Sequence, residues 1–146
     1  MYLMRVRRKT KGAALTETMA GIIFIIPVVL FIIDVIAMVL CQAQHDAMVK
    51  DCARAAAEEA SMTAGQTAAT NVATRWNTAG AHYLFRVNSC NTTYPNGPAS
   101  QTLRVQTNIT FIFPVPIPLM GLSQQDFVAE ATEPIIGRRA GQALLP

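Results

Sequence analysis

The 146-residue chain is poor in the side chains that carry most enzyme and metal chemistry, with two His and three Cys. Cys41 and His45 lie four residues apart, a spacing that suits a shared metal on a helix, but no second pair at ligand spacing completes a site. His82 stands alone before a predicted strand, and no nucleophile lies in a recognisable turn motif. The sequence therefore predicts a protein that is not an enzyme and needs no metal or cofactor, in which these residues are solvated or serve packing.

Basic residues are scarce once the first twelve positions are set aside. Five of the twelve Lys and Arg lie at positions 5–11, and the rest of the chain has seven of them against nine Asp and Glu, a net charge of −2. The only basic pair in that part is Arg138-Arg139. Because nucleic-acid binding needs clustered positive charge on the folded part, no nucleic-acid partner is expected.

Charge is nearly absent from Thr18 to Cys41, where Asp34 is the single charged residue in 24 positions. A hydrocarbon core of about 30 Å needs roughly 20 helical residues, so this run is long enough to cross a bilayer. The basic residues precede the run, and Lys50 is the first after it, which by the positive-inside rule keeps the N-terminus in the cytoplasm. The sequence thus predicts a basic leader at 1–12, a transmembrane helix at 13–41 and the bulk of the chain outside.

Two residues interrupt the apolar run. Pro27 lacks the N–H for one helical hydrogen bond, which predicts a kink at about residues 23–27. Asp34 is an intramembrane carboxylate, a rare kind of residue that is commonly functional. We expect Asp34 either to pair with a basic residue of a partner subunit or to lie near the outer interface of a tilted helix, and the sequence does not distinguish the two.

Beyond the run the sequence stays rich in Ala and lacks proline towards Trp76, which predicts that the same helix continues outside the membrane over 42–79. Gly65 is a weak point in it, and Asn77-Thr-Ala-Gly80 supplies the stop. Three- and four-residue spacing predicts a narrow packing face of mostly small residues: Ala43, Ala47, Met48, Cys52, Ala55, Ala56 and Ala60.

From residue 80 onward, short segments rich in β-branched and aromatic residues alternate with turn residues, which indicates a small antiparallel sheet over 80–136. Strands are predicted at about 83–89, 102–113 and 126–133. In the second of these, alternation predicts a core-directed face made of Leu103, Val105, Thr107, Ile109, Phe111 and Phe113. A turn is expected at Asn96-Gly97, an extended connector at the prolines 114, 116 and 118, and a loose tail at 137–146. The predicted fold is α+β, with a long N-terminal helix, half in the membrane and half outside, packed on this sheet.

The three cysteines lie at the outer end of the span, on the helix beyond it and far downstream. In an exported domain the simplest arrangement is one disulfide and one remaining thiol. Cys52 and Cys90 are the predicted pair, since Cys41 lies close to the lipid. Three buried thiols that never pair are an equally weighted alternative.

Two segments carry a resemblance to a known family. Gly12 precedes Ala13-Ala-Leu-Thr-Glu17, and Ala53-Arg-Ala-Ala-Ala57 follows the apolar run. In these segments the chain resembles the type IV pilin superfamily, in particular the TadE-like minor pilins or pseudopilins of tight-adherence (Flp) pilus systems. Asp34, late in the apolar run, is also similar to that family. The resemblance covers roughly residues 7–60.

The resemblance implies a structural subunit that is made as a precursor. A prepilin peptidase would cut between Gly12 and Ala13, where glycine lets extended backbone approach the enzyme, and the cut would remove all five basic residues that hold the N-terminus at the cytoplasmic surface. Implied partners are that peptidase, other pilin or pseudopilin subunits, an inner-membrane assembly platform and membrane lipid. The implied location is the bacterial inner membrane, with a periplasmic domain and entry into a pilus or related machine for adhesion or secretion.

Glu17 lies one helical turn from the amine that this cut would create at Ala13. In a filament its carboxylate is expected to neutralise the amine of a neighbouring subunit, and because an unpaired charge in an apolar bundle is costly, such a pair also sets the register. Alternatively, Glu17 lies at the headgroup level and interacts favourably with the dipole at the start of the helix.

Three other interpretations of the N-terminus stay open. An uncleaved single-pass anchor would present a periplasmic protein-interaction domain. An ordinary signal peptide would be cut before Gln44, although its apolar region would be too long. A lipoprotein signal needs a small residue before Cys41, and Val39-Leu40 fits that requirement badly.

Overall fold

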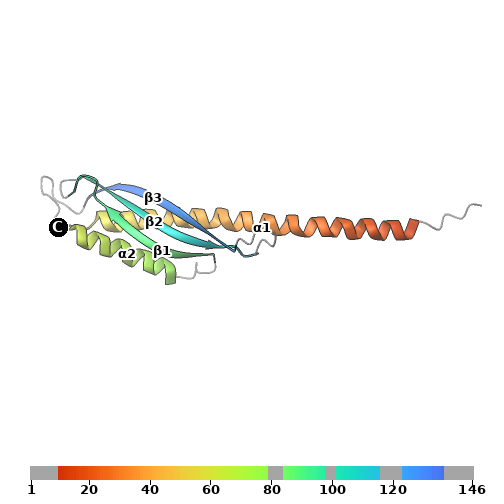
Figure 1. Ribbon diagram of the computed structural model, residues 1–146. Coiled ribbons are helices and arrows are strands. Elements are labelled where there is room, and N and C mark those ends of the chain that lie inside the picture. The colour runs from red at the N-terminus through yellow and green to blue at the C-terminus, as the bar shows by residue number, and fades with distance from the viewer. Residues whose placement is uncertain (1–9, 79–83, 98–100, 116–122, 137–146) are drawn as a thin grey trace, which may run out of the picture.

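The computed structural model describes residues 10–78, 84–97, 101–115 and 123–136. The elements follow in the order α1 (Thr10–Ala57), α2 (Met62–Thr78), β1 (Phe85–Thr93), β2 (Thr102–Ile112) and β3 (Gln124–Pro134). The strands form an antiparallel sheet in the order β1-β2-β3. Helix α1 packs along β2 and β3, and α2 packs against β1 and α1, so the helices form one layer and the sheet the other (Figure 1). The predicted α+β fold, with a long N-terminal helix on a small antiparallel sheet, is confirmed.

Helix α1 is the longest element, with 48 residues, and its first part extends away from the domain (Figure 1). It continues through Pro27 without a break. An unbroken helix can still bend at Pro27, so the kink at about residues 23–27 stays a prediction.

The prediction of one helix continuing to residue 79 is wrong. Helix α1 ends at Ala57, and α2 starts at Met62 and folds back along α1. Ser61 is the N-cap residue of α2, because its Oγ accepts a hydrogen bond of 3.1 Å from the N–H of Ala64. Glu58 and Glu59 disfavour continuation, since acidic side chains are unfavourable at a helix C-terminus and favourable before the next N-terminus.

Strand β2 is the centre of the sheet. It pairs with β1 from Phe85 opposite Phe111, and with β3 over its whole length. Its burial alternates strictly and directs Leu103, Val105, Thr107, Ile109 and Phe111 to the core, as predicted. The predicted turn is also confirmed, because Gly97 has φ of +62°, a conformation that favours glycine.

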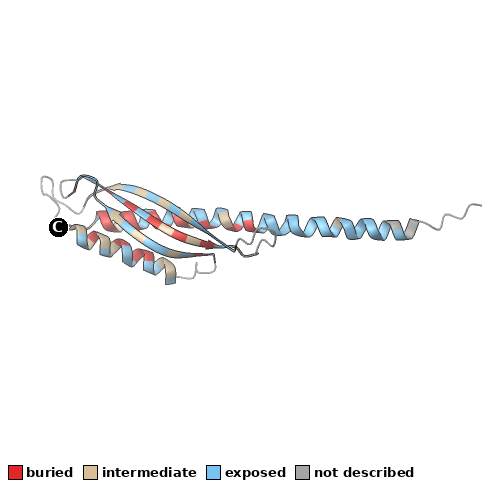
Figure 2. Cartoon of the chain, in the orientation of Figure 1, coloured by how far each residue is buried: buried red, intermediate tan, exposed pale blue. Residues whose placement is uncertain are grey.

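The core lies between the second half of α1, helix α2 and the inner face of the sheet (Figure 2). The packing face predicted for the helix is only partly right, since Ala43, Ala47 and Ala60 are exposed. The residues that α1 buries are Asp34, Ala37, Cys41, His45, Met48, Val49, Cys52, Ala53, Ala56 and Ala57. This face follows helical spacing but starts earlier and includes polar residues, because the sheet reaches further down α1 than the small-residue pattern indicates.

Candidate functional site

The predicted processing segment forms the first turns of α1. A Cβ added at Gly12 would meet no atom within 4 Å, so packing within the chain does not require glycine there. Glycine inside a helix is less stable than alanine by roughly 0.5–1 kcal/mol. Glu17 is exposed, and among the described residues no ion pair involves it. Both residues are therefore free to serve contacts outside the chain.

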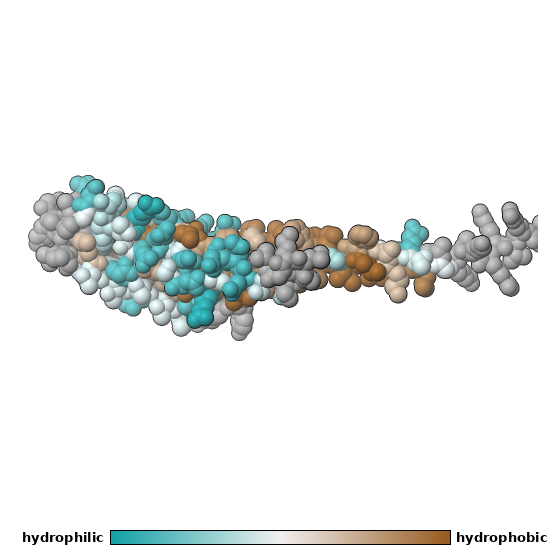
Figure 3. Space-filling view, in the orientation of Figure 1, coloured by the Kyte–Doolittle hydropathy of each residue, from teal (hydrophilic) through white to brown (hydrophobic). Residues whose placement is uncertain are grey.

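The part of α1 that the domain leaves uncovered has the length of a membrane span. Residues 14–33 are exposed, apart from the half-buried Gly21, and Asp34 is the first buried residue that follows. Along this stretch the surface is mainly hydrophobic (Figure 3). Twenty helical residues extend about 30 Å, the thickness of a bilayer's hydrocarbon core. By length and composition this helix can cross a membrane.

Asp34 marks the point where the domain begins to cover α1. Its side chain is 4% exposed, and its Oδ1 accepts a hydrogen bond of 3.2 Å from the backbone N–H of Val115, just beyond β2. The structure thus gives Asp34 a partner within its own chain. A buried carboxylate needs such a partner, because an unpaired charge away from water is costly.

His45 makes a second buried polar contact between α1 and the sheet. Its Nε2 lies 2.8 Å from Oγ1 of Thr107, and both residues are almost completely buried. Burial lowers the pKa of His45, while the carboxylate of Asp46 and the contact with Thr107 act in the opposite direction. Burial therefore favours the neutral form of the imidazole. This pairing agrees with the packing role predicted for His45, and no group of three metal-ligating side chains exists in the described ranges.

Helix α2 covers the outer edge of β1. The side chain of Gln66 donates to the carbonyl of Cys90 at 2.9 Å and accepts from the N–H of Thr92 at 2.7 Å. Asn77 Oδ1 accepts from the N–H of Val87 at 3.1 Å. Unpaired edge groups invite pairing with another chain, so α2 closes one edge of the sheet to strand addition.

The structure brings the predicted cysteine pair together. Cys52 on α1 and Cys90 on β1 are free thiols that share a hydrogen bond. The neighbouring Cys90 thiol and burial raise the pKa of Cys52, and the same hydrogen bond lowers the pKa of Cys90. Cys41 is buried eleven residues earlier on α1, about 16 Å away along the helix. The disulfide itself stays a prediction.

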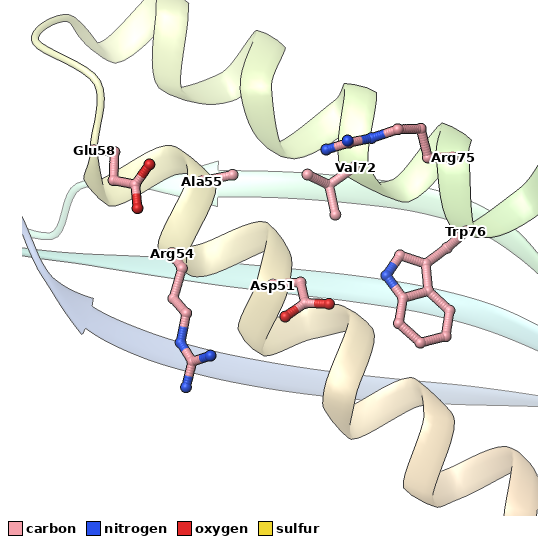
Figure 4. Close-up of a pocket in the computed structure, with 7 residues that line it drawn as sticks. All are labelled: Asp51, Arg54, Ala55, Glu58, Val72, Arg75 and Trp76. Atoms are coloured by element: carbon pink, nitrogen blue, oxygen red, sulfur yellow. The ribbon is translucent and has the colours of Figure 1, made fainter.

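An open groove of about 540 Å³ runs between the outer faces of α1 and α2 (Figure 4). Its lining mixes both charges with an indole ring and consists of Asp51, Arg54, Ala55, Glu58, Val72, Arg75 and Trp76. The arginine of the resembling segment, Arg54, belongs to this surface rather than to the core.

Sequence reasoning missed the polar contacts that hold the domain to the helix. Asp34 and Val115 are 81 residues apart, and His45 and Thr107 are 62 apart. The sequence did contain one sign of these contacts in its helical spacing. Asp34, Cys41 and His45 lie on one face of a helix together with Met48. A face that combines such polar residues with apolar ones indicates contact with another element rather than with lipid.

Protein-family models, curated proteins and solved structures give no match to this chain. The relation to TadE-like subunits therefore remains a resemblance of residues 7–60, and function is inferred from the sequence and the geometry of the described residues.

Proposed function

We propose that this chain is a structural, non-catalytic subunit of the TadE-like minor pilin or pseudopilin type. It is made with a basic leader, cut by a prepilin peptidase between Gly12 and Ala13, and held in the bacterial inner membrane with its N-terminus in the cytoplasm. Its α+β domain lies in the periplasm. From there it joins other pilin or pseudopilin subunits and the assembly platform of a tight-adherence pilus or related secretion machine.

One observation carries the proposal: a single helix is bare and apolar over its first half and covered by a small domain over its second half. The bare part is of span length, and among the described helices only α1 is both long and apolar enough to cross a membrane. A subunit that is stored in a membrane and later packs into a helical filament needs such a helix, because lipid and neighbouring helices offer it the same apolar surroundings.

The start of the helix supports processing. Gly12 has no packing role, which leaves recognition by a peptidase as a reason for glycine at this position. Glu17 is exposed and lies 17 residues before Asp34, at the opposite end of the bare segment. A carboxylate there is available to pair with the amine at Ala13 of a neighbouring subunit.

The signal-peptide alternative fits the structure poorly. A cut before Gln44 would fall inside α1 and would remove Asp34, Ala37 and Cys41, which pack against the domain. The uncleaved anchor differs from our proposal only in processing and polymerisation.

Sheared surface filaments from the native host test the proposal. We expect immunoblots to find this chain in the filament fraction or in a complex with assembly-platform proteins, and to lose it from both with Glu17→Ala. Thr18→Ala, a neighbouring change that removes only a hydroxyl bonded within the helix, is the matched control. A chain that stays in the membrane alone, unaffected by Glu17→Ala, would instead support a permanent anchor.

A further inference from the structure

The end of the domain that lies nearest the bare part of α1 reaches into the apolar run. Asp34 is followed by seven more uncharged residues, up to Cys41. Val115 donates a hydrogen bond directly to the Asp34 carboxylate, so the two residues lie at the same depth relative to any membrane that α1 crosses. The depth of Asp34 therefore fixes the depth of the end of the sheet.

Helix geometry gives that depth. Glu17 and Asp34 are 17 residues apart, which corresponds to about 26 Å along a helix. With Glu17 at the inner headgroups, Asp34 and Val115 lie inside the outer boundary of a hydrocarbon core of about 30 Å. A carboxylate at this depth needs a hydrogen-bond donor that comes from the protein, which is what Val115 supplies.

The surface at this level is apolar on both elements. On α1 the exposed side chains are Val35, Ile36, Val39 and Leu40. Next to them, beyond the end of β2, Ile112 and Pro114 are exposed and Phe113 and Val115 are half-buried. The sequence from Pro114 to Leu122 contains neither a charged nor a hydrogen-bonding side chain, and its last seven residues lie outside the described part.

Charged residues begin further along the domain, away from the bare part of α1. In the sheet, Arg86 and Asp126 both lie opposite Thr110, two residues before Ile112 on β2. On α1 the next charged residue after Asp34 is Asp46. The hydrophobic surface of the bare helix thus continues up to the domain before polar surface takes over (Figure 3).

We propose that this end of the domain, defined as Ile112–Val115 together with Val35, Ile36, Val39 and Leu40, contacts lipid in the outer leaflet of the bilayer. The proposal rests on the membrane placement of α1 proposed above. Lipid is the partner we infer, because this apolar surface is continuous with the bare part of α1 and lies at the depth of the hydrocarbon core. The domain is then seated in the membrane surface through two segments, α1 and the β2 end, which limits rotation of the domain about the helix.

Depth-dependent fluorescence quenching tests this seating in the full chain. Trp76→Phe removes the native tryptophan, and single tryptophans are placed at Ile112, at Pro114, at Ile25 in the bare helix and at Thr93 at the opposite end of β1. Each variant is reconstituted into phosphatidylcholine vesicles with and without acyl-chain-brominated lipid, and circular dichroism checks its folding. Pro114→Trp is the second probe in case Ile112→Trp does not fold.

We expect brominated lipid to quench Ile25→Trp and both β2-end probes, with blue-shifted emission, and to leave Thr93→Trp unchanged. Quenching of Ile25→Trp without quenching of Ile112→Trp or Pro114→Trp would overturn the inference while the span stands, and would point to water or a second copy at this surface. Absence of quenching at Ile25 would overturn the span, and with it both the proposed function and this inference.

Discussion

The carboxylate of Asp34 and the backbone N–H of Val115 form a hydrogen bond of 3.2 Å between the long helix and the segment that follows the central strand. Asp34 is the first buried residue after the bare apolar stretch. This contact therefore joins α1 to the domain at the point where the bare apolar stretch ends and the domain begins to cover the helix.

Replacement of Asp34 distinguishes its hydrogen bond with Val115 from a contact with a basic residue of a partner subunit. We expect Asp34→Ala to lower the free energy of unfolding by about 1–2 kcal/mol, since it leaves the part-buried N–H of Val115 without its acceptor. Asp34→Asn retains an acceptor oxygen and should stay near wild type. The measurement is thermal unfolding of the full chain in detergent, with Asp46→Ala, at an exposed position on the same helix, as control.

The same variants test whether Asp34 also takes part in subunit assembly. If Asp34 also pairs with a basic residue of a partner subunit, Asp34→Asn will fold normally yet fail to assemble. Equal stability of Asp34→Ala and the wild type would contradict the structural role described here.

Acid should destabilise the domain through His45. Because burial holds the folded-state pKa of His45 below its ordinary value of 6.5, the unfolded chain takes up the proton first as pH falls. Stability from this group is complete above about pH 6.5 and declines as pH falls below it towards the lowered folded-state pKa. Unfolding temperatures measured from pH 7.5 to 5 should fall more for wild type than for His45→Gln, and parallel curves would refute the assignment.

Gly65 is required by close packing. A Cβ at Gly65 would collide with the hydroxyl of Tyr94 and would lie 3.1 Å from the carbonyl oxygen of Ala56. We expect Gly65→Ala to cost about 1–3 kcal/mol, the range for overpacking, despite alanine's better helix propensity. Tyr94→Phe removes the hydroxyl, which has no hydrogen-bond partner among the described residues, and should rescue part of the loss in the double variant. Denaturant unfolding measures all four proteins, and an absence of coupling between the two changes would count against this contact.

The disulfide between Cys52 and Cys90 remains to be tested. The two thiols share a hydrogen bond, and a cavity of about 130 Å³ between α2 and β1 reaches Cys90. Each thiol would lose one proton and one electron to a disulfide-bearing oxidant, which would be reduced to two thiols. Closing the loop from residue 52 to 90 should add about 4 kcal/mol to stability on the chain-entropy estimate.

Mass spectrometry after alkylation in non-reducing conditions shows whether Cys52 and Cys90 form a disulfide. We expect only Cys41 to be labelled in the unfolded protein isolated from its host, and Cys41→Ser to leave the bond intact. Labelling of all three residues would favour the alternative of three unpaired thiols.

The parts of the fold that depend on local pattern were predictable. Alternation over 102–113 identified the central strand and its buried face, and Asn96-Gly97 identified a turn with a positive φ. Both follow from constraints that act within a few residues.

The helix break was not predicted, because the helix propensity of alanine across 53–60 outweighed a weaker signal for a break, and the weak point was expected at Gly65 instead. That signal was Glu58-Glu59 followed by the N-cap Ser61. The partners of Asp34 and His45 could not be predicted either, since each pairing depends on how the sheet lies along the helix. From sequence alone, the charge of Asp34 inside an apolar run suggested a functional role, whereas its hydrogen-bond partner within the chain became known only from the structure.

Intact mass and N-terminal sequence of the protein extracted from its host's membranes test the central claim most directly. The account predicts a chain that begins at Ala13 and lacks the twelve-residue basic leader. A chain that begins at Met1 would contradict processing and favour a permanent anchor. A chain that begins at Gln44 would show a secreted protein and overturn the pilin mechanism.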